Sequence, residues 1–121
     1  MMTDKAKLGA WGEIHAQRYM RKQGFKIADA NYKSRFGEID LICYDKSRLV
    51  FIEVKSRSQA KLASAMEYVD EAKQKRVMIT AEYFMRQYNF NLQPRFDVIE
   101  VYCDKSDFSK PVKINHIENA F

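Results

Sequence analysis

The pattern of apolar and polar positions predicts two helices. Apolar residues recur every three or four positions over residues 4–22 and again over residues 66–88, which is the spacing of an amphipathic helix. Thr3 and Asp4 are candidate caps for the first helix, and Gly24 is placed to end it. The apolar side of the second helix is expected to consist of Val69, Ala72, Val77, Ala81, Phe84 and Tyr88.

Shorter segments predict strands. The expected strands are residues 25–28, 37–44, 49–56, 96–103 and 112–116. The turn-forming composition of residues 45–48 predicts a β-hairpin between the second and third strands. Residues 31–35 are expected to form a polar connection, and residues 57–63 a polar, basic loop. The order α-β-β-β-α-β-β predicts an α/β fold with helices flanking a mixed central sheet.

Composition narrows the class of protein. The chain has 121 residues, 46% hydrophobic and 31% charged, which is typical of a globular protein and predicts one domain over residues 1–121. No apolar run could cross a bilayer and the first residues are polar, so we expect neither a membrane anchor nor a signal peptide. Cys43 and Cys103 lie in apolar strands, which predicts buried, reduced thiols and a cytoplasmic protein. The net charge of +5 is compatible with a polyanionic partner such as DNA.

The predicted hairpin brings ionisable residues together. Side chains two positions apart on a strand share a face, so Glu53 and Lys55 point the same way. Both registers compatible with a turn at residues 45–48 place Asp40 opposite Glu53, with Cβ atoms about 5 Å apart. Two carboxylates at this distance repel each other unless a cation lies between them. The spacing therefore predicts a site for Mg²⁺ or Mn²⁺ between Asp40 and Glu53, with Lys55 facing a phosphate or the attacking water.

The same residues have a second interpretation. The register also places Glu38 opposite Lys55, and the two could form an ordinary cross-strand ion pair in a lattice of surface charges. The apolar neighbours of Glu53 argue against simple exposure. The residues alone leave both interpretations open.

Both helices offer further candidates for the site. Gly9 and Gly12 are small enough to let the first helix approach the sheet and bring Glu13 near the carboxylates, although the pattern favours a solvated glutamate. Lys73 interrupts the apolar stripe of the second helix, and the pattern favours a side chain that extends to solvent over a phosphate ligand. The basic residues that could line a nucleic-acid groove are Arg35, Arg57, Lys61, Lys73, Lys75 and Arg76.

Short motifs run in a fixed order over nearly the whole chain. They are Gly9-x-x-Gly12-Glu13, Asn31-Tyr32-Lys33, Gly37-Glu38-Ile39-Asp40-Leu41-Ile42, Phe51-Ile52-Glu53-Val54-Lys55-Ser56-Arg57, Arg95-Phe96-Asp97-Val98-Ile99 and His116-x-x-Asn119-Ala120-Phe121. Together they resemble the YraN-like family of proposed endonucleases. That family belongs to the PD-(D/E)xK nuclease superfamily and is similar to archaeal Holliday junction resolvases.

The resemblance implies a restriction-endonuclease-like αβββαβ core. It also implies a metal-dependent endonuclease that uses Mg²⁺ or Mn²⁺ to hydrolyse DNA phosphodiester bonds, with selectivity for branched or junction DNA. The catalytic residues that it implies are Asp40 and Glu53, both as metal ligands, together with Lys55 and Glu13. The candidates for substrate binding are Lys73, Arg57 and Arg35. The segment after Arg57 departs from the family because it lacks a glycine before the helix.

Two other classes of function fit the same residues. A non-catalytic module could bind nucleic acid or dock a partner while retaining the nuclease fold, and the positive charge and small size support it. A homodimeric structural protein is the third interpretation, because a chain of 121 residues would need two copies to span a duplex.

Overall fold

The computed structural model describes residues 4–58, 69–104, 108 and 110–121 of the chain. Its elements follow the predicted order. They are α1 (Asp4–Lys22), β1 (Lys26–Ser34), β2 (Gly37–Tyr44), β3 (Arg48–Ser58), α2 (Glu71–Gln87), β4 (Gln93–Cys103) and β5 (Lys113–Ile117). Neither helix of the described part is long and apolar enough to cross a bilayer.

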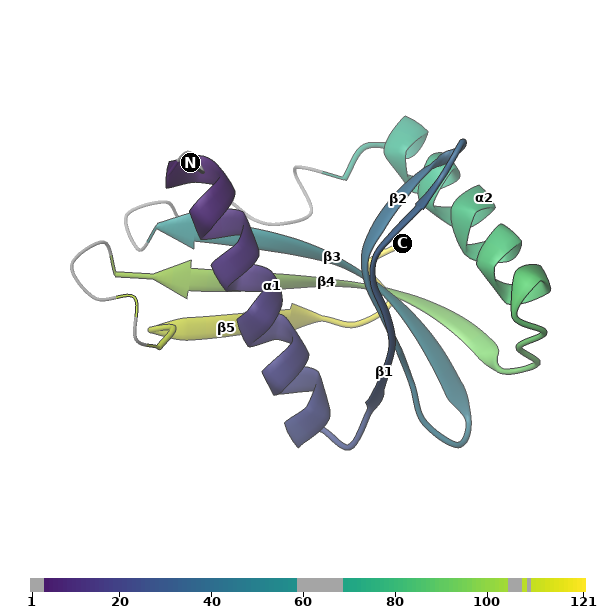
Figure 1. Cartoon of the computed structure of the whole chain (residues 1–121), viewed down its shortest axis with the longest axis horizontal. Coiled ribbons are helices and arrows are strands. Elements are labelled where there is room, and N and C mark those ends of the chain that lie inside the picture. Colours follow the sequence, from purple (N-terminus) through teal and green to yellow (C-terminus); the bar gives the residue numbers. More distant parts are fainter. Residues whose placement is uncertain (1–3, 59–68, 105–107, 109) are drawn as a thin grey trace.

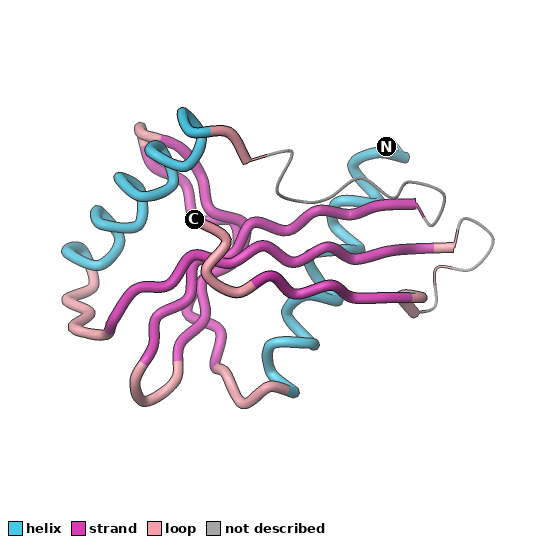
Figure 2. The backbone as a smooth tube through the Cα atoms, turned by 180° about the vertical axis from the view of Figure 1, so that it is seen from behind, coloured by secondary structure: helices cyan, strands magenta, loops and turns pink. Residues whose placement is uncertain are grey.

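The strands form one mixed sheet in the order β1-β2-β3-β4-β5. β3 and β4 are parallel, whereas the other neighbours are antiparallel. α1 lies across one face of the sheet, and α2 lies at the opposite face beside the β1–β2 hairpin (Figure 1, Figure 2). The predicted α/β fold is confirmed, and a five-stranded mixed sheet flanked by two helices is consistent with a restriction-endonuclease-like core.

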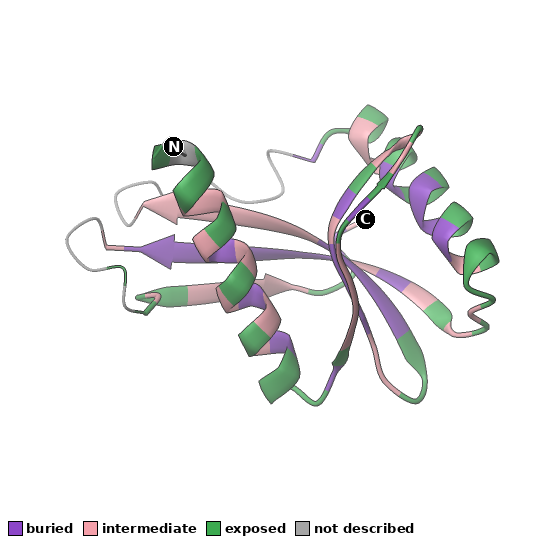
Figure 3. Ribbon diagram, in the orientation of Figure 1, coloured by how far each residue is buried: buried purple, intermediate pink, exposed green. Residues whose placement is uncertain are grey.

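β3 separates two hydrophobic cores. Val50 and Ile52 point to the core beneath α1, whereas Leu49 and Phe51 point to the core beneath α2. All four side chains are at most 1% exposed. Successive side chains of a strand alternate between faces, so a strand covered on both faces is apolar at every position. Figure 3 shows this burial along β3 and β4 and on the inner sides of the helices.

The end of α1 agrees with the prediction. Gly24 has a φ of 94°, and its N–H donates to the carbonyl of Arg21 at 3.0 Å. The N–H of Phe25 donates to the carbonyl of Met20 at 3.1 Å, which completes a Schellman motif. Glycine adopts this left-handed conformation without a steric penalty, so the helix ends here. At the other end Asp4 is the first residue of α1, and the second candidate cap, Thr3, lies outside the described residues.

α2 begins later than predicted. Its first residue is Glu71 rather than residue 66, because the Asp70 side chain accepts the N–H of Lys73 at 2.8 Å and caps the helix. Residues 66–68 lie outside the described part. Val69 precedes the helix and packs on Val98 instead of lying on the apolar side of α2. The buried residues of α2 are Val77, Thr80, Ala81 and Phe84, while Ala72 and Tyr88 are exposed.

β1 is longer than predicted. The predicted polar connection over residues 31–35 is wrong except at Arg35, because residues 31–34 belong to the strand. The strand continues through Ser34 because it pairs with β2 to the hairpin turn. Tyr32 is the apolar anchor of this half: it is 8% exposed, lies opposite Ile39, and donates its hydroxyl hydrogen to Gln87 on α2 at 2.7 Å. A partner strand thus orders residues whose own composition suggests a loop.

The remaining strands differ from the predictions at their ends. β3 includes Arg57 and Ser58, which were expected in a loop, because its parallel pairing with β4 continues to Ser58 and Cys103. Residues 59–63 of that expected loop lie outside the described part. β4 begins at Gln93 rather than residue 96, and β5 is shifted by one residue to Lys113–Ile117.

Both cysteines are buried and free, as predicted. Burial raises the pKa of the Cys43 thiol to about 12, because the charged thiolate is disfavoured away from water. Cys43 therefore stays a neutral core residue at physiological pH.

Candidate active site

The site lies where β2 and β3 stop pairing. Their ladder runs from Tyr44–Leu49 to Leu41–Ile52, which confirms the predicted register. One residue further, Asp40 uses its side chain in place of a backbone partner: Oδ2 accepts the N–H of Val54 at 2.8 Å. The Asp40 carboxylate is therefore fixed against β3 beside Glu53.

Four predicted catalytic residues line one pocket of about 320 Å³ there. α1 contributes one wall, β2 contributes Asp40, and consecutive residues of β3 form the floor. The lining residues are Leu8, Gly9, Glu13, Asp40, Glu53, Val54, Lys55, Ser56 and Arg57. The structure thus brings together residues from positions 8 to 57 of the sequence.

Gly12 allows α1 to approach the sheet closely enough for Glu13 to reach this pocket. A Cβ atom on Gly12 would lie 1.8 Å from Oγ and 3.1 Å from Cβ of Ser56 on β3. By contrast, a Cβ on Gly9 would meet nothing within 4 Å. Only Gly12 is therefore required by packing, and the solvated position favoured for Glu13 by the helical pattern is wrong.

This difference predicts opposite effects for two matched substitutions. Gly12→Ala is expected to lower the free energy of unfolding by about 1–3 kcal/mol, because Ser56 and the helix must move apart. Gly9→Ala is expected to raise it by up to about 1 kcal/mol, because alanine favours the helix. Urea unfolding of both variants measures the two effects. Equal stability of the two variants would show that α1 does not pack on Ser56 as described.

Two lysines converge on Glu53. Nζ of Lys73 lies 2.6 Å and Nζ of Lys55 lies 3.3 Å from the same atom, Oε1 of Glu53. The Glu53 side chain is only 10% exposed, so it is not part of a surface charge lattice. The expected extension of Lys73 to solvent is wrong, because its ammonium group is held in the site by this buried carboxylate.

The alternative ion pair between Glu38 and Lys55 is not formed. Lys55 contacts Glu53 instead, and Glu38 is exposed at the position where β2 pairs with Lys33 of β1. The strands diverge beyond Leu41, so the register no longer holds Glu38 against β3. Lys55 therefore remains within the carboxylate pocket.

The pocket raises the pKa of two of its carboxyl groups, those of Asp40 and Glu13. The pKa of Asp40 rises from 3.8 to about 7, first because of burial and then because of the negative charges of Glu53 and Glu13. The Val54 N–H and the charge of Lys73 oppose this rise but do not cancel it. Burial likewise raises the pKa of Glu13. The pocket thus gathers Glu13, Asp40 and Glu53 beside Lys55, Lys73 and Arg57.

The donor set fits a magnesium or manganese ion. Mg²⁺ binds through one or two carboxylates and keeps several water molecules, and it does not need a cage of protein ligands. Within the described residues no group of three or more Asp, Glu, His or Cys side chains forms such a cage. Asp40 and Glu53 supply the two carboxylates, and both lysines contact Oε1 of Glu53 rather than Oε2.

The predicted basic residues are only partly gathered here. Arg57 lines the pocket. Arg35 lies in the β1–β2 turn, with its guanidinium 4.9 Å from the ring centre of Phe36, and is not part of the lining. Lys75 is exposed on α2, 3.9 Å from Glu71, and Lys61 lies outside the described residues.

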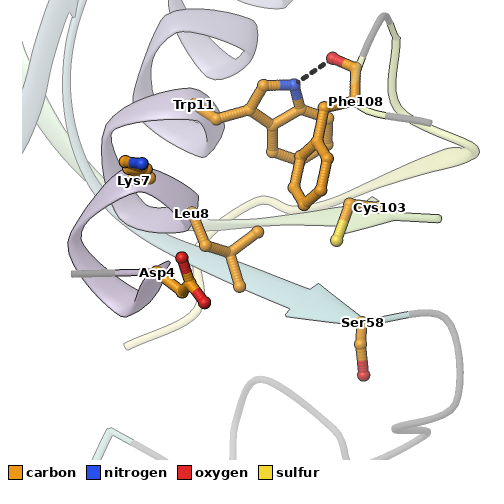
Figure 4. Close-up of a pocket in the computed structure, with 7 residues that line it drawn as sticks. All are labelled: Asp4, Lys7, Leu8, Trp11, Ser58, Cys103 and Phe108. Carbon is orange, nitrogen blue, oxygen red and sulfur yellow. Dashed lines mark hydrogen bonds between the residues drawn. The ribbon is translucent and has the colours of Figure 1, made fainter. Parts of the chain in front are cut away.

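A larger pocket of about 720 Å³ lies on the other side of Leu8 (Figure 4). The indole N–H of Trp11 donates to the carbonyl of Phe108 at 2.7 Å at its edge. The lining of this pocket is mostly apolar. Among the described residues that line it, Asp4 is the single carboxylate. The described lining of this larger pocket contains no opposed pair of acids. The smaller pocket, which contains Asp40 and Glu53, is therefore the better candidate for the active site.

Two features of the structure are not predicted from the sequence. Asn31 was noted only within a motif, but it has a φ of 59° and its side-chain amide opposes the rise that burial causes in the pKa of Glu13. His116 was given no role, yet Nε2 lies 2.7 Å from Oδ2 of the buried Asp97. Asn31 lies in a segment that the sequence predicts as a polar connection, so its polarity gave no signal there. Nothing local in the sequence joins His116 to Asp97 either.

Comparison with known proteins identifies relatives along the whole chain. The uncharacterised protein family UPF0102 matches residues 12–101. A UPF0102 protein of Caldanaerobacter subterraneus subsp. tengcongensis is 41% identical over 120 residues, 98% of either chain. One of Clostridium botulinum (strain Alaska E43 / Type E3) is 44% identical over 117 residues, 94% of this chain and 93% of the relative. One of Clostridioides difficile (strain 630) is 41% identical over 121 residues, 99% and 100% of the two chains. The chain therefore belongs to the UPF0102 family, the YraN-like family that its motifs resemble.

Proposed function

We propose that this protein is a metal-dependent endonuclease that hydrolyses phosphodiester bonds of DNA. The observation that carries the proposal is the Asp40 carboxylate held by the N–H of Val54 just beyond the β2–β3 ladder, next to Glu53, with its pKa raised to about 7. Two half-buried acids that could share a cation, with a lysine beside them, suit phosphoryl chemistry better than structural stability.

Each residue of the pocket has a role in this proposal. A bound Mg²⁺ or Mn²⁺ would acidify a water molecule and neutralise charge on the phosphate. Asp40 and Glu53 would hold the ion, and Lys55 would place its positive charge on the scissile phosphate or the nucleophile. Glu13 would accept a hydrogen bond from water in the pocket. Lys73 would hold the Glu53 side chain in its orientation through the 2.6 Å contact.

The substrate follows from charge and from the family. Arg57 at the edge of the pocket and the net charge of +5 suit a polyanionic backbone. We propose Arg35 and Lys73 as further contacts to DNA, and branched or junction DNA as the preferred structure. A homodimer could present two such pockets to two strands.

Cleavage of plasmid and branched DNA with Mg²⁺ or Mn²⁺ tests the proposal. Asp40→Asn and Lys55→Ala are each expected to lower the rate at least about 100-fold, because they remove a metal ligand and a transition-state charge. Asp45→Asn and Lys75→Ala are matched controls on the surface and should cleave at the wild-type rate. Undiminished cleavage by both pocket variants would reject this active site.

A second candidate is a non-catalytic module that binds nucleic acid or a partner. The observation that favours it is the pair of lysines on Glu53, which compensate this acid without a metal. Calorimetric titration with Mn²⁺ separates the two functions. The endonuclease requires binding that Asp40→Asn abolishes, whereas a folded protein that binds DNA but no Mn²⁺ would be the module.

A further inference from the structure

Asn31 adopts a conformation that its place in the fold does not explain. Three non-glycine residues of the described part have a positive φ: Asn31, Asn89 and Asn119. Asn89 follows the C-cap of α2, and Asn119 follows β5, where the chain changes direction. Asn31, with a φ of 59°, lies inside β1. A left-handed residue in a strand costs about 1–3 kcal/mol, and such outliers concentrate at functional sites.

The outlier lies directly across from the candidate metal ligand. β1 pairs Ala30 with Leu41 and Tyr32 with Ile39, so the intervening residues Asn31 and Asp40 occupy opposite positions. These two positions are skipped in the ladder. β2 thus turns Asp40 away from β1 toward Val54 of β3 at the same point where β1 leaves its regular geometry.

The side chain of Asn31 lies beside Glu13 of α1. Burial raises the pKa of the Glu13 carboxyl, the Asn31 amide opposes this rise, and the negative charges of Glu38 and Glu53 add to it. An amide is the suitable donor there, because it fixes a carboxylate without neutralising it. A lysine at this position would compete with a cation, and an acid would add repulsion to a pocket already rich in carboxylates.

We propose that Asn31 is a positioning residue, which holds the Glu13 carboxylate in the pocket formed with Asp40 and Glu53. The inference rests on the proposed endonuclease function and adds to it a residue from the edge strand. In a regular strand the side chains alternate between the two faces. The left-handed conformation of Asn31 breaks this alternation and directs its amide toward α1.

Two substitutions separate this role from a structural one. Asn31→Gly suits the positive φ, so it should fold as stably as the wild type or more so, but it removes the donor. Asn31→Asp keeps the shape and replaces the donor by a fourth carboxylate. Asn89→Gly and Asn89→Asp make the same changes at a left-handed asparagine remote from the pocket.

We expect kcat to fall about 10-fold in Asn31→Gly and about 100-fold in Asn31→Asp, with an unchanged KM for DNA. Both Asn89 variants should retain wild-type kcat. A purely structural role would instead lower the melting temperature in proportion to the loss of activity. Wild-type kcat in Asn31→Gly would overturn the proposal.

A readout without activity distinguishes failure of this inference from failure of the proposed function. The side-chain amide signal of Asn31 in nitrogen-15 NMR should shift in Glu13→Ala and stay unchanged in Glu82→Ala, a control on the exposed face of α2. No shift in Glu13→Ala would overturn the inference. If the wild type cleaves no DNA, the endonuclease is rejected, and the amide shift alone then supports or overturns the Asn31–Glu13 contact.

Discussion

Replacing Asp97 by alanine is expected to lower the free energy of unfolding by about 3–5 kcal/mol, the largest loss for any single residue considered. Asp97 is 0% exposed and accepts two short bonds from Arg95, at 2.9 and 2.8 Å. It also bonds Nε2 of His116 at 2.7 Å and the N–H of Asn119 at 3.1 Å. Its removal leaves the guanidinium of Arg95, 9% exposed, without the carboxylate that balances its charge.

This network holds the end of the chain on the sheet. His116 also bonds the hydroxyl of Tyr19 on α1 at 3.0 Å, and the N–H of Ala120 donates to the carbonyl of Phe96 at 2.7 Å. Loss of Asp97 therefore frees β5 and the C-terminal residues together. Glu82→Ala, which breaks an exposed ion pair with Arg86, is the control and should change stability by less than about 1 kcal/mol.

Asp97 is also expected to make the free energy of unfolding decrease at low pH. Burial alone would raise its pKa, but hydrogen bonds from His116, Arg95 and the N–H of Asn119 outweigh burial and lower the pKa below 3.8. The stabilisation is present above the unfolded value and is lost as pH falls through the lower folded value. Urea unfolding at pH 2–7 measures both effects. An Asp97→Ala variant with wild-type stability at pH 7 would contradict this account.

The second large effect is a gain of stability as pH falls from 8 to 5 in the metal-free protein. The pKa of Asp40 rises from 3.8 to about 7 because of burial and the charges of Glu53 and Glu13, against the opposing charge of Lys73. The folded state therefore takes up a proton more readily than the unfolded state. This contribution is fully present below pH 3.8 and is lost as pH rises through about 7. The difference corresponds to at most about 4 kcal/mol.

A divalent cation should reverse this loss. On the proposed function, Mg²⁺ or Mn²⁺ would take the place of the proton on Asp40 at pH 8, so either ion should raise the melting temperature of the wild type. Asp40→Asn is neutral at every pH, so it should remove both the slope between pH 5 and 8 and the metal effect. Thermal unfolding with and without Mn²⁺ at each pH is the measurement. If stability depends on pH in Asp40→Asn as steeply as in the wild type, the pH dependence arises from another group.

The hairpin and its register could be predicted from the sequence, because both are local. A short turn at residues 45–48 admits few registers, and strand side chains alternate strictly. The turn is stabilised by its own residues: Asp45 accepts the N–H of Arg48 at 2.8 Å and forms an ion pair with its guanidinium. The opposition of Asp40 and Glu53 therefore followed from counting along two adjacent strands.

The remaining site depended on contacts between distant segments. Nothing near Lys73 in the sequence tells whether its side chain reaches solvent or Glu53, because the choice depends on where Asp70 starts α2 and how the helix meets β3. Glu13 similarly reaches the pocket only because Gly12 packs on Ser56.

The sequence by itself determined the family motifs, the order of the elements and the two opposed carboxylates. Tertiary structure alone decided which neutral and basic side chains surround them, including Asn31 and Lys73. It also joined Asp97 to His116 across β4 and β5. The physical reason is the range of the interactions. Backbone alternation and turn closure act over a few residues, whereas the partner of a buried charge is set by the packing of the whole sheet.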